Sequence, residues 1–194
     1  MGMDAIYPEL LDTSVSIFRC DADADVLRGF SATVRYTGDD DAEPREIGRL
    51  SGWLTREVYS DVADAGDALS ADGMILGSAA QKLVDEHEGD RILDAVVMLD
   101  RATLEPEYRG QKLLGALVDD LLDVLQLEPT ETIVVVFPES LPLVRGAPRP
   151  EGEERQVGLR KLSRALEASG FQQIDEEQPA DDEAVTVWWR PFPD

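Results

Sequence analysis

Apolar and polar positions alternate with a period of two in the first third of the chain. Three such runs, rich in Val, Ile, Thr and aromatic residues, span residues 14–20, 30–37 and 46–58. This alternation is typical of half-buried strands. The polar segment GDDDAEP at 38–44 separates the second run from the third and favours a hairpin turn. The chain is therefore expected to begin with three strands, the last two joined as a hairpin.

The period then changes to that of a helix. Apolar residues recur at three- and four-residue intervals from about residue 61 to residue 88. The run RILDAVVMLDRATL at 91–104 predicts a buried strand. In the segment QKLLGALVDDLLDVLQL at 111–127, leucines keep the helical spacing and aspartates take the opposite face. This last segment is the most regular helical pattern in the sequence.

Strand and helix patterns alternate in the C-terminal part. The segment TIVVVF at 132–137 predicts a second buried strand, 159–170 predicts a helix that ends in glycine, and 184–189 predicts a closing strand. The intervening segment 138–158 is rich in proline and glycine and predicts a long loop. This order favours an α/β fold with a mixed central sheet flanked by helices, in which 91–104 and 132–137 are parallel neighbours. Because no linker is visible, we expect a single domain over residues 1–194.

Composition limits the partners and the compartment. The chain has 18 basic and 41 acidic residues, a net charge of −23, which argues against nucleic acid and anionic membranes as partners. The single cysteine indicates a reducing compartment. The acidic N-terminus does not resemble a signal peptide, and no apolar run reaches the roughly 18 residues of a membrane helix. We therefore expect a cytoplasmic protein.

Several familiar functional motifs are absent from the sequence. It contains neither G-x-G-x-x-G, nor G-x-x-x-x-G-K-[ST], nor G-x-S-x-G. The only histidine, His87, is expected to be solvated near a helix end. The DADAD segment at 21–25 lacks the glycine and glutamate of a calcium loop, so a polar turn is favoured. With one histidine and one cysteine, no metal site is expected.

The segment LEPEYRGQKLLGAL at 104–117 is the strongest candidate for a binding site. A strand that ends at Leu104 and a helix that begins near Arg109 would present free backbone N–H groups to an anion. Arg109 and Lys112 add positive charge to a chain that is otherwise acidic. Two interpretations remain open on the residues alone. The segment is either a pyrophosphate site or an ordinary turn whose arginine pairs with a nearby acid.

The segments LEPEYRG, GAL and LSRALEASGFQQI together resemble the GCN5-related N-acetyltransferase (GNAT) superfamily. The resemblance covers about residues 91–190. It implies a GNAT-like central sheet and the transfer of an acetyl or acyl group to an amine, carried by a small molecule or a peptide. The cosubstrate would be acetyl-CoA or another acyl-CoA, with no metal.

The resemblance also implies roles for particular residues. The pantetheine arm would pair with the strand backbone, and the pyrophosphate would lie on the amides of the turn. The implied binding residues are Thr103, Leu104, Glu105, Arg109, Gly110, Gln111, Lys112, Leu113, Leu114 and Gly115. The candidate bases are Glu105 and Asp100, although a solvated carboxylate is the simpler identity for either.

The sequence departs from the family pattern at several positions. Lys112 and Leu114 stand where the family has glycines, Leu166 where many members have a tyrosine that acts as the acid, and Leu159 where an asparagine is common. Restoring the tyrosine, Leu166→Tyr, is expected to leave activity unchanged or raise it. The alternatives are therefore an N-acyltransferase with an altered cofactor site and a catalytically inactive binding or scaffolding protein of the same fold. A third is a self-associating module, such as a homodimer, that uses the terminal strand and its two tryptophans at 188–189.

Overall fold

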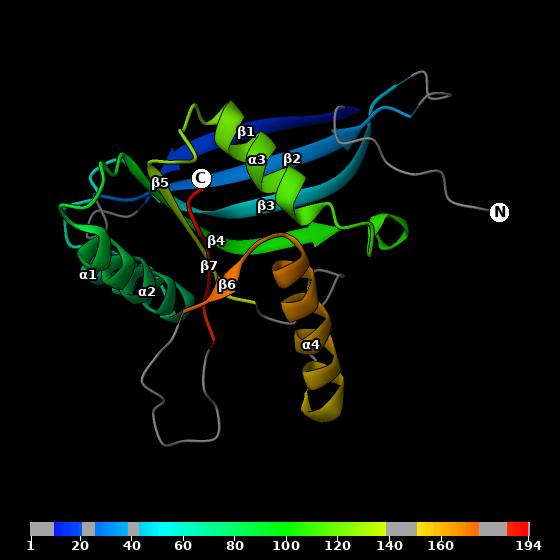
Figure 1. The fold of residues 1–194 in the computed structure, drawn as a ribbon. Helices are drawn as coiled ribbons and strands as arrows, with labels where there is room; N and C mark the ends of the chain where they lie inside the picture. The colour runs from blue at the N-terminus through cyan, green and yellow to red at the C-terminus, as the bar shows by residue number, and fades with distance from the viewer. Residues whose placement is uncertain (1–9, 21–25, 39–42, 139–150, 175–185, 194) are drawn as a thin grey trace.

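The structure is a computed structural model that describes residues 10–20, 26–38, 43–138, 151–174 and 186–193. Its strands form one seven-stranded mixed sheet with the order β1-β2-β3-β4-β5-β7-β6 (Figure 1). The strands are β1 (Leu11–Arg19), β2 (Arg28–Tyr36), β3 (Arg45–Thr55), β4 (Ala95–Leu104), β5 (Thr132–Val136), β6 (Gln172–Gln173) and β7 (Trp188–Arg190). The helices are α1 (Val62–Asp67), α2 (Ala71–His87), α3 (Leu114–Val124) and α4 (Gly152–Ala168), with a short 3₁₀ helix, η3 (Pro106–Tyr108). The predicted α/β class is confirmed.

The centre of the sheet is the parallel pair β4 and β5, and every other neighbouring pair in the described sheet is antiparallel. The pairing runs from Ala95 opposite Thr132 to Leu99 opposite Val136. The helix α3 lies between these two strands in the chain. The predicted parallel arrangement of the two apolar runs is therefore confirmed.

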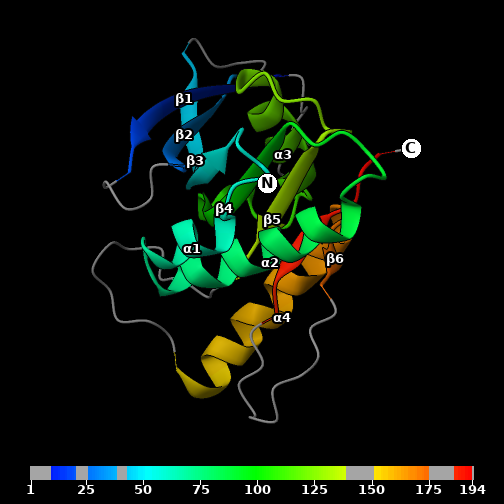
Figure 2. The same ribbon diagram turned by 90° about the vertical axis from the view of Figure 1, so that its left-hand side faces the viewer.

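Helices cover both faces of the sheet. The helix α3 packs on one face, and α1 and α2 pack on the other (Figures 1 and 2). Side chains of β4 alternate between the two cores: Val97 and Leu99 lie in the core beneath α3, whereas Val96 and Met98 lie in the core beneath α2. Because the first five residues of β4, 95–99, are buried on both faces, this part of its sequence is continuously apolar rather than alternating.

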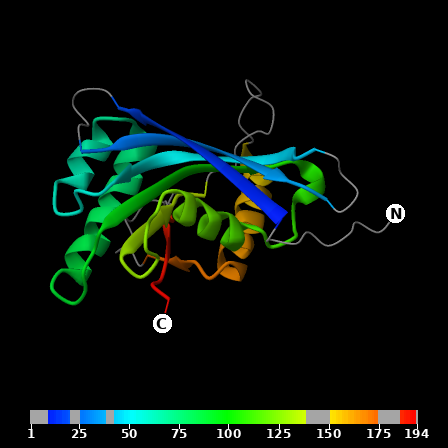
Figure 3. The same cartoon turned by 90° about the horizontal axis from the view of Figure 1, so that it is seen from above.

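The fourth helix, α4, stands apart from this layered arrangement. It extends away from the sheet, as Figures 1 and 2 show, and only its last turns approach the body. In Figure 3, seen from above, α4 lies beneath the strands. Leu166 is its one buried residue, with 3% of its surface exposed.

Several element boundaries differ from the sequence-based expectations. The helical region 61–88 is two helices, because the Ser70 side chain accepts a hydrogen bond from the Gly73 N–H and begins a second helix there. Similarly, β4 begins at Ala95 and α3 at Leu114, later than predicted. The predicted loop 138–158 is wrong at its end, since α4 begins at Gly152. The two glutamates that follow favour a helix start through the helix dipole.

Other expectations concern the N-terminal strands, the turns and the membrane. The three N-terminal strands are confirmed, with β2 and β3 antiparallel neighbours. The DADAD turn and most of the hairpin tip fall outside the described residues. Within the described ranges, no helix is both long and apolar enough to span a membrane.

The aromatic residues near the C-terminus correct two expectations. His87 is not simply solvated: its ring centroid lies 5.2 Å from that of Phe192 and 5.7 Å from that of Trp189. Trp188 is buried in the core with 1% of its surface exposed. The expectation of a self-association surface that uses both tryptophans is therefore wrong, because Trp188 packs in the core of its own chain.

Candidate functional site

The strand β4 continues beyond the end of its parallel neighbour. It pairs with β5 only as far as Leu99, and its remaining residues, 100–104, have β3 as their one neighbouring strand within the described part of the chain. Figure 1 shows this end of β4 running toward the turn that leads to α3. The outer edge of residues 100–104 can therefore pair with an extended ligand, as a sheet edge pairs with an added strand.

A β-bulge marks the point where the two strands separate. On β3, Ser51 pairs with Arg101 and Gly52 pairs with Leu99, so Asp100 is an extra residue in β4. A bulge bends its strand and changes the direction of nearby backbone groups and side chains. The position of the bulge beside the departing β5 makes this segment a candidate for binding or catalysis.

The turn after β4 has an unusual backbone. The N–H of Tyr108 donates to the Glu105 carbonyl and the N–H of Arg109 to that of Pro106, which closes η3. Two residues then adopt left-handed conformations: Gly110 with φ +75° and Lys112 with φ +59°. Glycine reaches this region without strain, whereas a lysine does so at a cost. Lys112 is therefore held in a conformation that favours glycine.

The turn ends at a helix start with free N–H groups. Leu113 precedes α3 and supplies no side-chain cap, and its carbonyl accepts the hydrogen bond from the Leu117 N–H. The N–H groups of Leu114, Gly115 and Ala116 have no acceptor among the residues that the structure describes. Such groups carry the positive end of the helix dipole and can bind an anion.

The two cations of the turn have different environments. The guanidinium of Arg109 folds back and donates from both Nε and Nη2 to the Leu104 carbonyl, at 2.8 and 2.7 Å. It therefore closes the turn, with a carbonyl as its partner rather than the acid expected of an ordinary turn. Lys112 is exposed and forms no ion pair with a described residue. Of the two cations, Lys112 is the one available to a phosphate.

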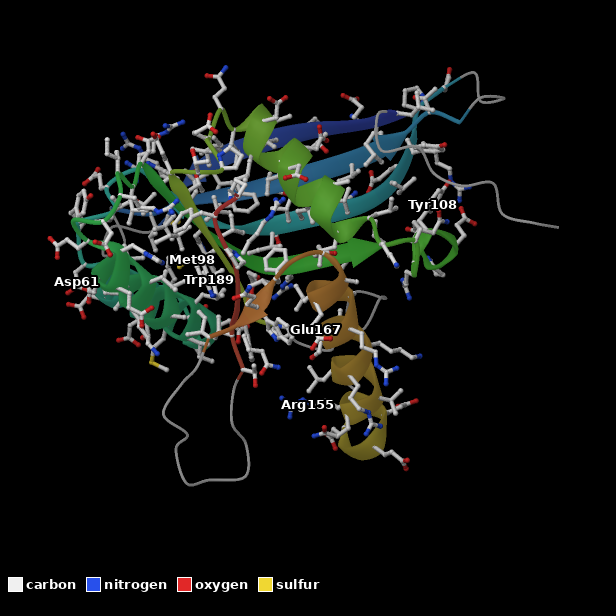
Figure 4. All side chains as sticks on the ribbon, viewed as in Figure 1. Asp61, Met98, Tyr108, Arg155, Glu167 and Trp189 are labelled. Carbon is white, nitrogen blue, oxygen red and sulfur yellow. The ribbon has the colours of Figure 1, made fainter. Side chains whose placement is uncertain are left out.

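Residues of β2 and β3 hold the turn from one side. The Glu105 N–H donates to the Ile47 carbonyl at 2.9 Å, and Glu107 forms an ion pair with Arg45 at 2.7 Å. The ring of Tyr108, labelled in Figure 4, packs edge-on against Tyr36 with centroids 6.4 Å apart. These partners were not predictable, because each contact joins segments that lie far apart in the chain.

The end of α4 meets the turn from the other side. A Cβ added to Gly115 would lie 3.6 Å from the Cβ of Ser169, so the glycine brings the start of α3 close to the end of α4. Leu166 packs in the core with Leu113 and Leu117. A buried leucine in this position changes the expectation for Leu166→Tyr, because the larger ring would have to be accommodated in a packed core.

The implied site residues thus have distinct surroundings. Those of the strand end and turn, Thr103 through Gly115, form one continuous segment of the surface in which only Leu113 is buried. Glu105 is exposed. Asp100 is half-buried and forms an ion pair with its neighbour Arg101 at 3.1 Å, which leaves the proposed base next to a cation.

Neither comparison with known sequences identifies the chain. No family model and no curated protein sequence matches it. Within the described residues, no group of three or more His, Cys, Asp or Glu side chains is placed to hold a metal ion.

Proposed function

We propose that this protein is a GNAT-type N-acyltransferase that transfers an acetyl or other acyl group from acyl-CoA to an amine. One observation carries the proposal: β4 leaves β5 at a bulge, and its open edge leads directly into a turn with free helix-start amides. An extended, amide-containing arm followed by a pyrophosphate is a ligand of matching chemistry.

The binding roles follow from this match. The backbone of Thr103, Leu104 and Glu105 would pair with the pantetheine amides. The N–H groups of Leu114 and Gly115 would donate to the pyrophosphate. These donors belong to the backbone, so the replacement of family glycines by side chains does not remove them. Lys112 adds a cation next to them, which offsets the repulsion between a phosphate and a chain of net charge −23.

The reaction requires little from the protein beyond orientation. The amine nitrogen attacks the thioester carbonyl, the C–N bond forms, the C–S bond breaks, and the proton lost by the amine ends on the CoA sulfur. Asp100, at the bulge, or Glu105 would accept the proton from the attacking amine. A backbone N–H of β4 would stabilise the oxyanion, and holding the two reactants together supplies much of the acceleration.

A catalytically inactive binding protein of the same fold is the second candidate. This candidate is favoured by Leu166, a buried core residue at the position where many members of the GNAT superfamily have the tyrosine that acts as the acid. In that case acyl-CoA would bind without being consumed.

Amide NMR shifts during titration with acetyl-CoA test the proposed site. We expect the largest changes at residues 100–104 and at Leu114–Ala116, with little change along α2, which lies on the other face of the sheet. Changes spread evenly over the surface, or centred on α2, would contradict the site. Release of free CoA thiol with a panel of amines then separates the two candidates, since the inactive protein shows the same shifts and no release above the rate without protein.

A further inference from the structure

The solvent face of α4 carries a row of three cations. Arg160, Lys161 and Arg164 are all exposed, and none forms an ion pair with a described residue. Their spacing of i, i+1 and i+4 places them on one side of the helix, opposite Leu166, which faces the core. Figure 4 shows the side chains of α4 spread around a helix that extends from the body. We call these three residues the cationic row.

This row contrasts with the rest of the chain. Helix α4 contains four basic and three acidic residues of the 18 basic and 41 acidic in the sequence. The remainder therefore has 14 basic against 38 acidic residues, a net charge of −24. Three cations within five residues, with no ion-pair partner among the described residues, are unexpected in so acidic a protein unless an acidic surface covers them.

The helix α3 carries a row of opposite charge with the same spacing. Asp119, Asp120 and Asp123 also stand at i, i+1 and i+4, and we call them the aspartate row. Asp119 and Asp123 are exposed, and Asp120 is half-buried. At 1.5 Å per residue, each row spans about 6 Å, so the two rows match in length when the helices lie side by side.

The two rows do not neutralise each other within one molecule. No ion pair joins them, and the partner of Asp119 is Arg190, whose Nη1 lies 2.6 Å from Asp119 Oδ1. One exposed valine also lies on each helix: Val157 on α4 is 37% exposed, and Val124 on α3 is 41% exposed. Each helix therefore offers charge with an adjoining apolar contact.

We propose that the cationic row of α4 docks on the aspartate row of α3 in a second copy of this chain. Because each copy carries both rows, two copies can exchange the contact around a twofold axis, which closes the assembly at a dimer. The contact is independent of acyl-CoA and of the proposed reaction. Nucleic acid is a poorer occupant, because three cations on a body of net charge −24 would not hold a polyanion against long-range repulsion.

The charge distribution gives the association a characteristic salt dependence. At about 0.01 M salt the Debye length is about 30 Å, so the two acidic bodies repel each other across the whole molecule. At about 0.1 M it falls to about 10 Å, which screens the bodies more than the rows in contact. At about 1 M it is about 3 Å, and the row contacts weaken as well. Dimerisation should therefore be strongest at the intermediate concentration.

Sedimentation equilibrium of the full chain at these three salt concentrations measures the association. We expect the triple variant Arg160→Glu, Lys161→Glu, Arg164→Glu to raise the dimer dissociation constant by about tenfold or more at about 0.1 M salt, since the row on α4 then repels the aspartate row. The single variant Arg160→Glu is compared with a control, Arg19→Glu. Arg19 is an exposed arginine on β1, and its replacement by glutamate changes the net charge by the same amount. Arg19→Glu should leave the dissociation constant within about twofold of the wild-type value, as expected of a charge outside the contact.

The decisive test exchanges the charges of the two rows between two variants. The variant Asp119→Lys, Asp123→Lys and the triple α4 variant should each be monomeric alone and should associate when mixed, because both contacts are then again between opposite charges. If the double α3 variant does not fold by circular dichroism, Asp123→Lys replaces it, since Asp119 and its pair with Arg190 are then kept. A wild-type monomer at all three salt concentrations, an unchanged dissociation constant for the triple variant, or no association on mixing would overturn the proposal. A monomer whose cationic row instead binds heparin would assign the row to a polyanion and would overturn it equally.

Discussion

Replacement of Lys112 by glycine should make the protein more stable. Lys112 has φ +59°, in the left-handed region that costs a residue with a side chain about 1 to 2 kcal/mol. Glycine removes that cost but brings about 0.5 to 1 kcal/mol of additional backbone entropy in the unfolded chain. The net expectation is a gain of about 0.5 to 1 kcal/mol in the free energy of unfolding, which corresponds to a rise of about 1 to 4 °C in Tm for a chain of this length.

Two control variants separate the backbone from the side chain. Lys112→Ala removes the cation but keeps a Cβ in the left-handed region, so it should not gain stability. Gly110→Ala makes the reverse change at φ +75°, where an added Cβ would meet no atom within 4 Å. Its cost of about 1 kcal/mol or more would therefore come from the backbone alone.

Urea unfolding monitored by circular dichroism measures all three variants. If Lys112→Gly is no more stable than Lys112→Ala, the left-handed lysine carries no strain and the reasoning fails. The same variant should bind acyl-CoA about 1 to 2 kcal/mol more weakly than the wild type, because it lacks the cation beside the phosphate. Stability and binding are thus expected to change in opposite directions.

Two further predictions follow from the packing and from a charge pair on β3. Leu166→Tyr should lower the free energy of unfolding by about 1 to 3 kcal/mol, because the larger side chain overpacks the core. Leu166→Ala should lower it by about 2 to 5 kcal/mol, because it leaves a cavity. Urea unfolding measures both, and a Tyr variant as stable as the wild type would show that this end of the core is open. The hydrogen bond from Arg49, at 2.6 Å, holds the pKa of the Glu46 carboxyl below its ordinary value. The small contribution of this hydrogen bond to stability is therefore present at pH values above the ordinary glutamate pKa, and it is lost as the pH falls through the lowered pKa of Glu46. Carboxyl NMR titration should show the pKa of Glu46 rising in Arg49→Gln, and an unchanged value would refute the assigned cause.

The parts of the fold that were predictable are those with strong local patterns. The apolar runs at 95–99 and in TIVVVF indicate strands buried on both faces, and the helix between them has a clear helical period. The connection between two such strands favours a parallel pair. The start of α4 was not predictable in the same way. Its surroundings are rich in proline and glycine, and the helix-favouring glutamates after Gly152 were too few to outweigh that composition.

The candidate site was predictable in its position but not in its detail. The Arg-Gly turn was visible in the sequence, and so was the absence of family glycines at Lys112 and Leu114. The bulge at Asp100 was not, because an extra residue in a strand leaves the apolar pattern before it intact. The hydrogen bonds from the Arg109 guanidinium to the Leu104 carbonyl depend on the path of the turn, which residue types alone do not specify.

Calorimetric titration with acetyl-CoA and with desulfo-CoA tests the central proposal most directly. It should be made at about 0.01 and 0.1 M salt, since screening of the acidic body favours an anionic ligand at the higher concentration. We expect saturable binding by the wild type, weaker binding by Lys112→Glu, and wild-type binding by Lys82→Glu, a lysine on α2 that pairs with Glu86. No measurable binding of either compound at about 1 mM, which corresponds to a binding free energy weaker than about −4 kcal/mol, would contradict the acyl-CoA site at the turn.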